Sequence, residues 1–212
     1  MQTDRLIAAL AADANDAPRR IGPMLVLALL AALPVSVALF MSTLGMRPDV
    51  RTAMHNPFFD LKFAVTLALA FAAIAVSLHL ARPEASFKRW GWLLTIPVGL
   101  IACGIMAEMA MPHERPWLTR LIGNNARYCV SAIPLFALPF LAAALLVLRR
   151  GAPSRPALAG AVAGLVAAGL GATLYASHCV DDSPLFVMVW YSIATAFVAA
   201  VGAVAGRRML RY

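Results

Sequence analysis

The chain contains a short polar stretch, SHCVDDSP, at the start of Ser177–Tyr191, and apolar sequence surrounds it. It places an imidazole, a thiol and two carboxylates within five residues: His178, Cys179, Asp181 and Asp182. Thiolates bind soft metal ions and are oxidised to disulfides, and nearby imidazole or carboxylate groups add ligands or tune the thiol pKa. A simple turn between helices needs none of these groups. The stretch is therefore a candidate site for thiol or metal chemistry, with His178, Asp181 and Asp182 as supporting residues.

A second cysteine, Cys129, stands at the start of one apolar segment, and Cys179 follows the end of the next. If both segments are antiparallel membrane helices, the two thiols lie at the same depth, where facing helix ends bring Cα atoms to the roughly 4.4–6.8 Å that a disulfide needs. Three interpretations stay open: a structural disulfide, two unpaired thiols, or a pair that responds to oxidants or metal ions. In the metal case Cys129, Cys179 and His178 are the ligands. Cys103 lies mid-segment and is interpreted as a small apolar residue.

Motifs typical of catalysis are missing from the sequence. It has no CxxC, HExxH or GxSxG motif and no phosphate-binding loop. We therefore expect neither an enzyme nor a cofactor. Two alternatives remain: a thiol oxidoreductase that uses Cys129 and Cys179 with a membrane quinone, and a metal-ion transporter with Glu108, His113 and Asp181 along its path.

The composition identifies the surroundings of these residues. Hydrophobic residues make up 62% of the 212 positions and charged residues only 13%, and the mean hydropathy is +0.79. Soluble domains are about 45–50% apolar and about 25% charged. A soluble core of this size cannot hide so much apolar surface, so membrane lipid is the expected solvent.

Six apolar runs are long enough to cross a bilayer, which takes roughly 20 residues. The sequence thus predicts an all-α, polytopic integral membrane protein. Residues 1–20 form an N-terminal segment, residues 21–206 the transmembrane domain and residues 207–212 a tail. The predicted spans are Ile21–Leu44, Leu61–Ala81, Gly91–Ala110, Tyr128–Leu148, Ala157–Ser177 and Leu185–Gly206.

Basic residues predict the orientation of these spans. The net charge is +8, and twelve Lys and Arg lie in the termini and even-numbered loops against six in the odd-numbered loops. The positive-inside rule then places both termini in the cytoplasm and Cys129 and Cys179 outside it, at the inner membrane of a bacterium. The same rule explains the positive charge, so no direct nucleic-acid partner is expected. Glycine-rich faces leave open whether the chain forms a homo-oligomer.

The N-terminal segment predicts a short amphipathic helix. Thr3 is a suitable N-cap, Asp4 follows it, and a proline ends the Ala-rich run. Helices that lie on membranes favour Lys and Arg on their polar face, whereas this segment offers Asp4, Arg5 and Asp13. A groove in a cytoplasmic protein is therefore the better partner. The candidate partner-binding residues are Thr3, Asp4, Leu6, Ile7, Leu10 and Asp13.

A family resemblance is carried by the six spans and by three stretches, in this order: TDRLIAALAAD, GNNARYC and HCVDDSPLFVMVWY. With these features the sequence resembles the NrsF family of membrane anti-sigma factors. The resemblance runs over essentially the whole chain. It implies that the N-terminal segment contacts an extracytoplasmic-function sigma factor, with the basic loops Arg82–Arg89 and Arg149–Arg155 as further contacts. It also implies that Cys129 and Cys179 are the family's two characteristic cysteines. They would sense heavy-metal or oxidative stress and release the sigma factor.

Overall fold

The computed structural model describes residues 3, 5, 7, 21–81, 87–112, 115–151 and 153–210. Within these ranges every regular element is helical, and six helical stretches are long and apolar enough to cross a membrane. The prediction of an all-α polytopic membrane protein is confirmed. The elements are α2 (Ile21–Thr43), α3 (Val50–Ala53), α4 (Pro57–Leu80), α5 (Phe87–Trp90), η1 (Gly91–Leu94), α6 (Thr95–Ala110), α7 (Trp117–Ile122), α8 (Ala126–Leu148), α9 (Pro156–Ala176), α10 (Pro184–Phe186), η2 (Val187–Tyr191) and α11 (Ser192–Met209).

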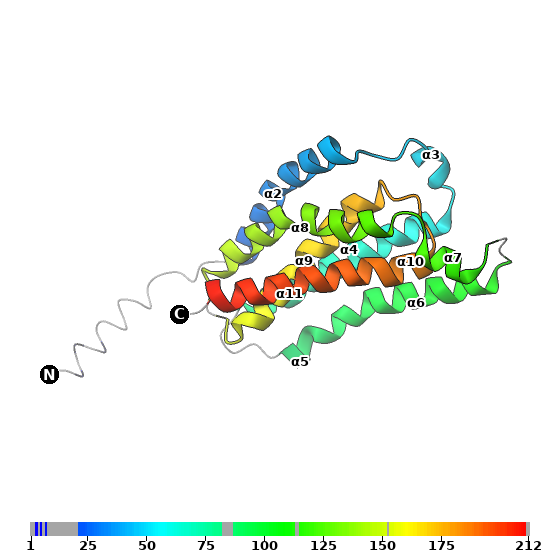
Figure 1. Cartoon of the computed structure of the whole chain (residues 1–212). Helices are drawn as coiled ribbons and strands as arrows, with labels where there is room; N and C mark the ends of the chain where they lie inside the picture. Colours follow the sequence, from blue (N-terminus) through cyan, green and yellow to red (C-terminus); the bar gives the residue numbers. More distant parts are fainter. Residues whose placement is uncertain are drawn as a thin grey trace.

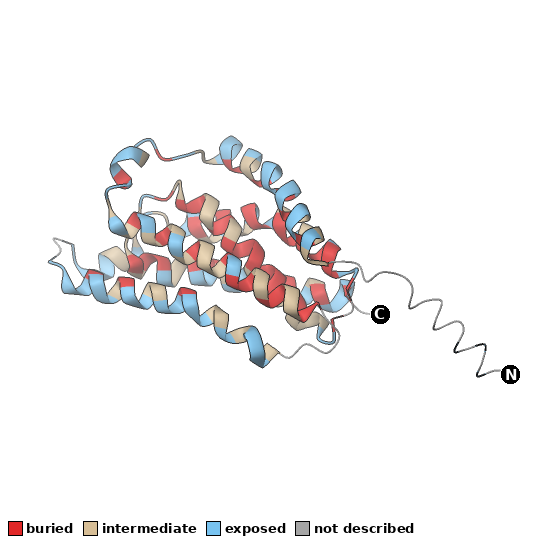
Figure 2. Cartoon of the chain, turned by 180° about the vertical axis from the view of Figure 1, so that it is seen from behind, coloured by how far each residue is buried: buried red, intermediate tan, exposed pale blue. Residues whose placement is uncertain are grey.

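Helix α9 is the centre of the bundle and packs against α4, α8 and α11 (Figure 1). Buried residues concentrate on α9 and on the sides of its neighbours that face it, while α2 and α6 expose most of their side chains (Figure 2). Exposed apolar side chains on those outer helices suit a lipid solvent. The central position of α9 fixes where its C-terminal end, and the cysteine that follows it, can lie.

Small residues let α9 and α11 approach closely. A Cβ atom on Gly160 would collide with the backbone of Gly202 and lie 2.8 Å from the Cα of Gly206. Close backbone approach is how helices pack in membranes, where there is little hydrophobic drive between them. The rotation of α11 about its axis is therefore fixed by this contact.

Several spans begin earlier than the hydropathy pattern predicts. Helix α4 starts at Pro57 because Asn56 caps it, its side-chain oxygen accepting a hydrogen bond from the Phe58 N–H. This start places Lys62 in the second turn of the helix and not at the very end of the span. The third span is assembled from α5, η1 and α6, and the short helix α7 precedes α8.

The two ends of the bundle differ in charge. The start of α2, helix α5 and the end of α11 lie at one end, and α3, α7 and the connection after α9 lie at the other (Figure 1). We call the second the loop end, and residues 177–183 the thiol loop. Every carboxylate that the structure describes belongs to the loop end: Asp49, Asp60, Glu108, Asp181 and Asp182.

The predicted N-terminal helix is described at three positions only. Thr3, Arg5 and Ile7 are helical and exposed. The other candidate partner-binding residues, Asp4, Leu6, Leu10 and Asp13, lie outside the described residues.

Candidate functional site

The two candidate cysteines meet at the loop end, as their positions in the sequence predict. Cys129 lies in the first turn of α8, and Cys179 lies three residues after α9, the helix packed beside α8. Both are free thiols with no exposed surface, in one apolar cluster with Phe136, Tyr175 and Tyr191. Cys103 is different, because it is exposed on α6 and lies outside this cluster.

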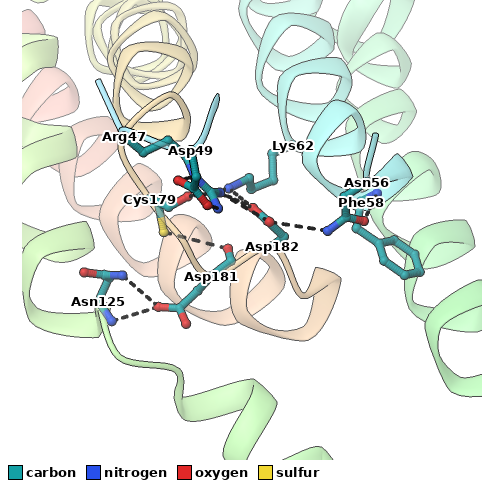
Figure 3. Close-up of polar contacts among 9 residues, drawn as sticks. All are labelled: Arg47, Asp49, Asn56, Phe58, Lys62, Asn125, Cys179, Asp181 and Asp182. Atoms are coloured by element: carbon teal, nitrogen blue, oxygen red, sulfur yellow. Dashed lines mark hydrogen bonds and ion pairs between the residues drawn. The ribbon is translucent and has the colours of Figure 1, made fainter. Parts of the chain in front are cut away.

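The Cys179 thiol is held in its protonated, unreactive form. The Cys179 thiol donates to the backbone carbonyl oxygen of Asp181, with 3.7 Å between Sγ and that oxygen (Figure 3). Burial raises the pKa of the Cys179 thiol above its usual range, and the positive charge of Lys62 offsets part of that rise. Because the thiolate is the reactive species, the closed structure protects this thiol.

Asp181 joins the thiol loop to the start of α8. Its Oδ2 accepts hydrogen bonds from the backbone N–H of Asn125 at 2.8 Å and from the Asn125 side chain at 3.1 Å (Figure 3). It also accepts one from the backbone N–H of Asn124 at 2.9 Å. Gly123 permits this approach: it has φ 60°, and a Cβ there would lie 2.9 Å from the Asp181 carboxyl carbon. The GNNAR stretch thus serves as a cradle of N–H donors for one carboxylate.

Asp182 is the acceptor for a buried cluster of cations. Lys62 Nζ lies 2.6 Å from its Oδ1, and Arg47 Nη1 lies 3.2 Å from the same oxygen. Asn56, the cap of α4, donates to Oδ2 at 3.3 Å (Figure 3). The Lys62 and Arg47 side chains are only 1% and 7% exposed, so both depend on these partners for their charge.

The same two cations also hold the backbone of Cys179. Its carbonyl oxygen accepts hydrogen bonds from Lys62 Nζ at 2.9 Å and from Arg47 Nη1 at 3.2 Å. Both cations lie over the face of the Phe59 ring. The ring centroid is 5.2 Å from Lys62 Nζ and 5.6 Å from the Arg47 guanidinium carbon. The position of Cys179 is therefore set by side chains from two other segments of the chain.

The connection between α2 and α3 closes over the thiol loop. The Arg47 guanidinium forms a bidentate ion pair with Asp49, in which Nε and Nη2 each donate to one carboxylate oxygen at 2.7 Å. The backbone N–H of Arg47 donates to the backbone carbonyl of Ser177. The hydrogen bond from Arg47 lowers the Asp49 pKa to about 2 and, in return, raises the pKa of Arg47. His178 Nδ1 donates to the carbonyl of Gly45 at 3.0 Å. His178 thus fastens this connection to the loop.

Glu108 ties α6 and α7 to the end of the thiol loop. Its Oε1 accepts from Arg120 at 2.6 Å and from the Ser183 hydroxyl at 2.7 Å, and its Oε2 accepts from the Leu185 N–H at 3.4 Å. Glu108 is 2% exposed. A pocket of about 390 Å³ lies beside this junction, lined by Glu108, Asp181 and Asp182, each of which already accepts hydrogen bonds from the protein.

The metal ligands expected from the sequence are not assembled in this structure. Among the described residues, no three His, Cys, Asp or Glu side chains come together in a way that could hold a metal ion. His178 contacts Gly45, while Cys129 and Cys179 lie in the apolar cluster. His113, named for a transport path, lies outside the described residues.

Sequence reasoning missed Lys62 and Arg47, which it counted only as charges flanking the spans. The available signal was Asn56-Pro57, a helix start that moves Lys62 into the second turn of an apolar helix. An ionisable residue inside a span is a functional candidate. Glu108 was named on the path of the alternative transporter, and its partner Arg120 could not be identified without the fold.

Comparisons with known proteins match this sequence over nearly all of its length. The family model NrsF, negative regulator of sigma F, matches residues 10–212. The anti-sigma-F factor NrsF of Caulobacter vibrioides (strain NA1000 / CB15N) is 37% identical, and the alignment covers all of both chains. A probable anti-sigma-F factor NrsF of Azospira oryzae (strain ATCC BAA-33 / DSM 13638 / PS) is 33% identical over the same full coverage. No solved structure matches.

Proposed function

The chain belongs to the NrsF family of anti-sigma factors, whose role is regulatory and not catalytic, and from that premise we propose how it works. It holds a sigma factor of the extracytoplasmic-function class inactive at the inner membrane. It releases that factor when Cys129 and Cys179 respond to oxidants or heavy-metal ions. The observation that carries the proposal is the burial of both thiols at the loop end, opposite the start of α2 and the end of α11 (Figure 1).

The charge distribution supports cytoplasmic termini. The described carboxylates all belong to the loop end, and the opposite end presents Lys88, Arg89, Arg155, Arg207 and Arg208. The positive-inside rule favours the basic end in the cytoplasm. The thiol loop then faces the periplasm, where oxidation of cysteines is maintained.

The sigma factor binds at the basic end in this proposal. The N-terminal segment, with Thr3, Asp4, Leu6, Ile7, Leu10 and Asp13, docks into a groove of the sigma factor. The exposed Ile7 supports a role in binding, because 59% of its surface is open. The basic loops beside α5 and α9 add further contacts with the sigma factor.

The input is a change in the two thiols. With a peroxide as oxidant, both thiols lose a proton and an electron, the S–S bond forms, and the peroxide is reduced to water. A soft metal ion acts instead by displacing the thiol protons and binding both sulfurs. A tenfold loss of sigma affinity requires only about 1.4 kcal/mol between the two states.

Sigma-dependent transcription tests this function. Cys129→Ser and Cys179→Ser should each abolish induction of a sigma-dependent reporter by peroxide or cadmium, with the sigma factor still co-purifying with the membrane protein. Cys103→Ser is the matched control, since that thiol lies outside the cluster, and should induce normally. Normal induction in both Cys129→Ser and Cys179→Ser would end the sensing role. Loss of the sigma factor from the unstressed wild-type complex would end the sequestering role.

A further inference from the structure

Lys62 is an unusual residue in this chain. The sequence has only two lysines, and all its other cations are arginines. Lys88 is exposed at the basic end, whereas Lys62 is 1% exposed within a membrane-spanning helix. A buried ammonium group carries a large desolvation cost unless it is paired, so its partners show what it is for.

Both polar partners of Lys62 belong to the thiol loop. The ammonium group contacts Asp182 Oδ1 at 2.6 Å and the carbonyl of Cys179 at 2.9 Å. Lys62 therefore binds the thiol loop on both sides of Asp181. The backbone carbonyl of Asp181 in turn accepts from the Cys179 thiol. If the Lys62 contacts are lost, the backbone carbonyl of Cys179 keeps only its hydrogen bond from Arg47.

Lys62 and Arg47 have different attachments. Arg47 is bound on two nitrogens to Asp49 and belongs to the short connection after α2. Lys62 belongs to α4, which runs the full length of the bundle to its basic end. One turn further along α4, the Thr66 hydroxyl accepts a hydrogen bond from the Thr173 hydroxyl of α9 at 3.0 Å. Polar contacts between α4 and the α9 segment therefore continue beyond Lys62. Of the two cations, only Lys62 belongs to a helix that reaches the opposite end.

We propose that Lys62 is the positioning residue of the sensor: its ion pair with Asp182 keeps the thiol loop closed over Cys129 and Cys179. Separation of this pair gives reagents access to the thiols and frees α4 from the loop. The inference rests on the proposed sensing function for its biological meaning. Its physical content, the control of thiol access by one buried ion pair, is testable without the sigma factor.

Thiol labelling in native membranes is the first test, using the full chain with Cys103→Ser so that only the two buried thiols react with a maleimide. Labelling of a buried thiol requires local opening. Lys62→Met and Asp182→Asn should each label at least tenfold faster than the parent. The control Arg127→Met removes an exposed cation near Cys129 and should leave the rate unchanged. Equal rates in the parent and in both pair variants would overturn the proposal.

The wild-type chain supplies a second measurement that does not depend on the folding of a variant. Acetylation by acetic anhydride, followed by mass spectrometry, compares Lys62 directly with the exposed Lys88. Lys62 should react at least tenfold more slowly at rest, and its rate should rise at least tenfold once peroxide has oxidised the two thiols. Continued protection of Lys62 after complete oxidation would overturn the coupling between the ion pair and the thiols.

The same strains separate this inference from the proposed function. If Lys62→Met speeds labelling but oxidised thiols never release the sigma factor, the ion pair controls access and the sensing role is lost. If the cysteine variants abolish induction while labelling ignores both pair variants, the sensing role stands and the role of Lys62 is overturned.

Discussion

The backbone N–H of Asn125 donates to Oδ2 of Asp181 at 2.8 Å, which fixes the start of α8 against the thiol loop. Asn125 precedes Cys129 by one helical turn, and Asp181 follows Cys179 by two residues. The hydrogen bond between Asn125 and Asp181 thus fixes the positions of Cys129 and Cys179 relative to each other. The cradle of N–H donors also explains why this position carries a carboxylate, since charge-assisted hydrogen bonds are the stronger ones.

Removing this charge should loosen the loop. Asp181→Asn keeps an oxygen acceptor but loses the negative charge that three donors share, and we expect a loss of about 1–3 kcal/mol. The thermal midpoint of the protein in detergent measures it. Asp60→Asn is the control: this exposed carboxylate lies in the first turn of α4, where its interaction with the helix dipole is worth less than about 1 kcal/mol. An equal shift in both variants would contradict the role of the cradle.

Acid should weaken the connection between α2 and α3 in a defined pH range. The folded Asp49 has a pKa of about 2, below its unfolded value of about 3.9. A carboxyl whose pKa is lowered by folding contributes its stability above the unfolded pKa and loses it as the pH falls through the folded one. The difference in thermal midpoint between wild type and Asp49→Asn should therefore be constant from pH 7 to about 5. It should shrink between about pH 4 and 2. A difference that persists at pH 2 would refute the pairing with Arg47.

The buried pair of Glu108 and Arg120 should behave as one unit. Glu108→Gln leaves the Arg120 guanidinium without its carboxylate, and loss of one partner of a buried pair costs about 3–5 kcal/mol. The double variant Glu108→Gln with Arg120→Gln should be less destabilised than the sum of the single variants. Thermal denaturation of the four proteins gives this coupling energy. Additive effects would show that the pair makes no joint contribution.

The contact between α9 and α11 predicts a contrast between two glycines. Gly160→Ala places a methyl group against the backbone of Gly202 and should cost about 1–3 kcal/mol through overpacking. Gly99→Ala, in α6, meets no atom within 4 Å and should be neutral or slightly stabilising. Thermal midpoints of the two variants check this. Equal stability would mean that the two helices do not approach as closely as described.

The N-terminal segment should be required for sigma binding. Ile7→Asp together with Leu6→Asp removes the apolar side of the predicted helix, and co-purification of the sigma factor should fall below detection. Gln2→Ala is the control and should bind normally. Undiminished co-purification by the double variant, at equal amounts of membrane protein, would refute the docking prediction.

Much of the fold could be predicted from hydropathy, because each span needs only length and apolar character. The common depth of Cys129 and Cys179 followed from their places at helix ends. The partners of Asp182 could not be predicted, since Lys62 and Arg47 come from distant segments and only packing brings them together. The burial of the thiols was missed for the same reason, because the aromatic residues in their cluster come from several helices, among them α2, α9 and η2.

The π-helical turn η2 lies near the loop end of the last span, between the three-residue α10 and the long helix α11. A π turn holds one residue more than an α turn, and such turns often lie beside functional sites. On one side, Pro184 follows the thiol loop; on the other, Gly202 and Gly206 fix α11 against α9. Without the extra residue, α10 would turn by about 100° relative to α11. The wide turn therefore lets α10 follow the position of the thiol loop while α11 keeps its contact with α9.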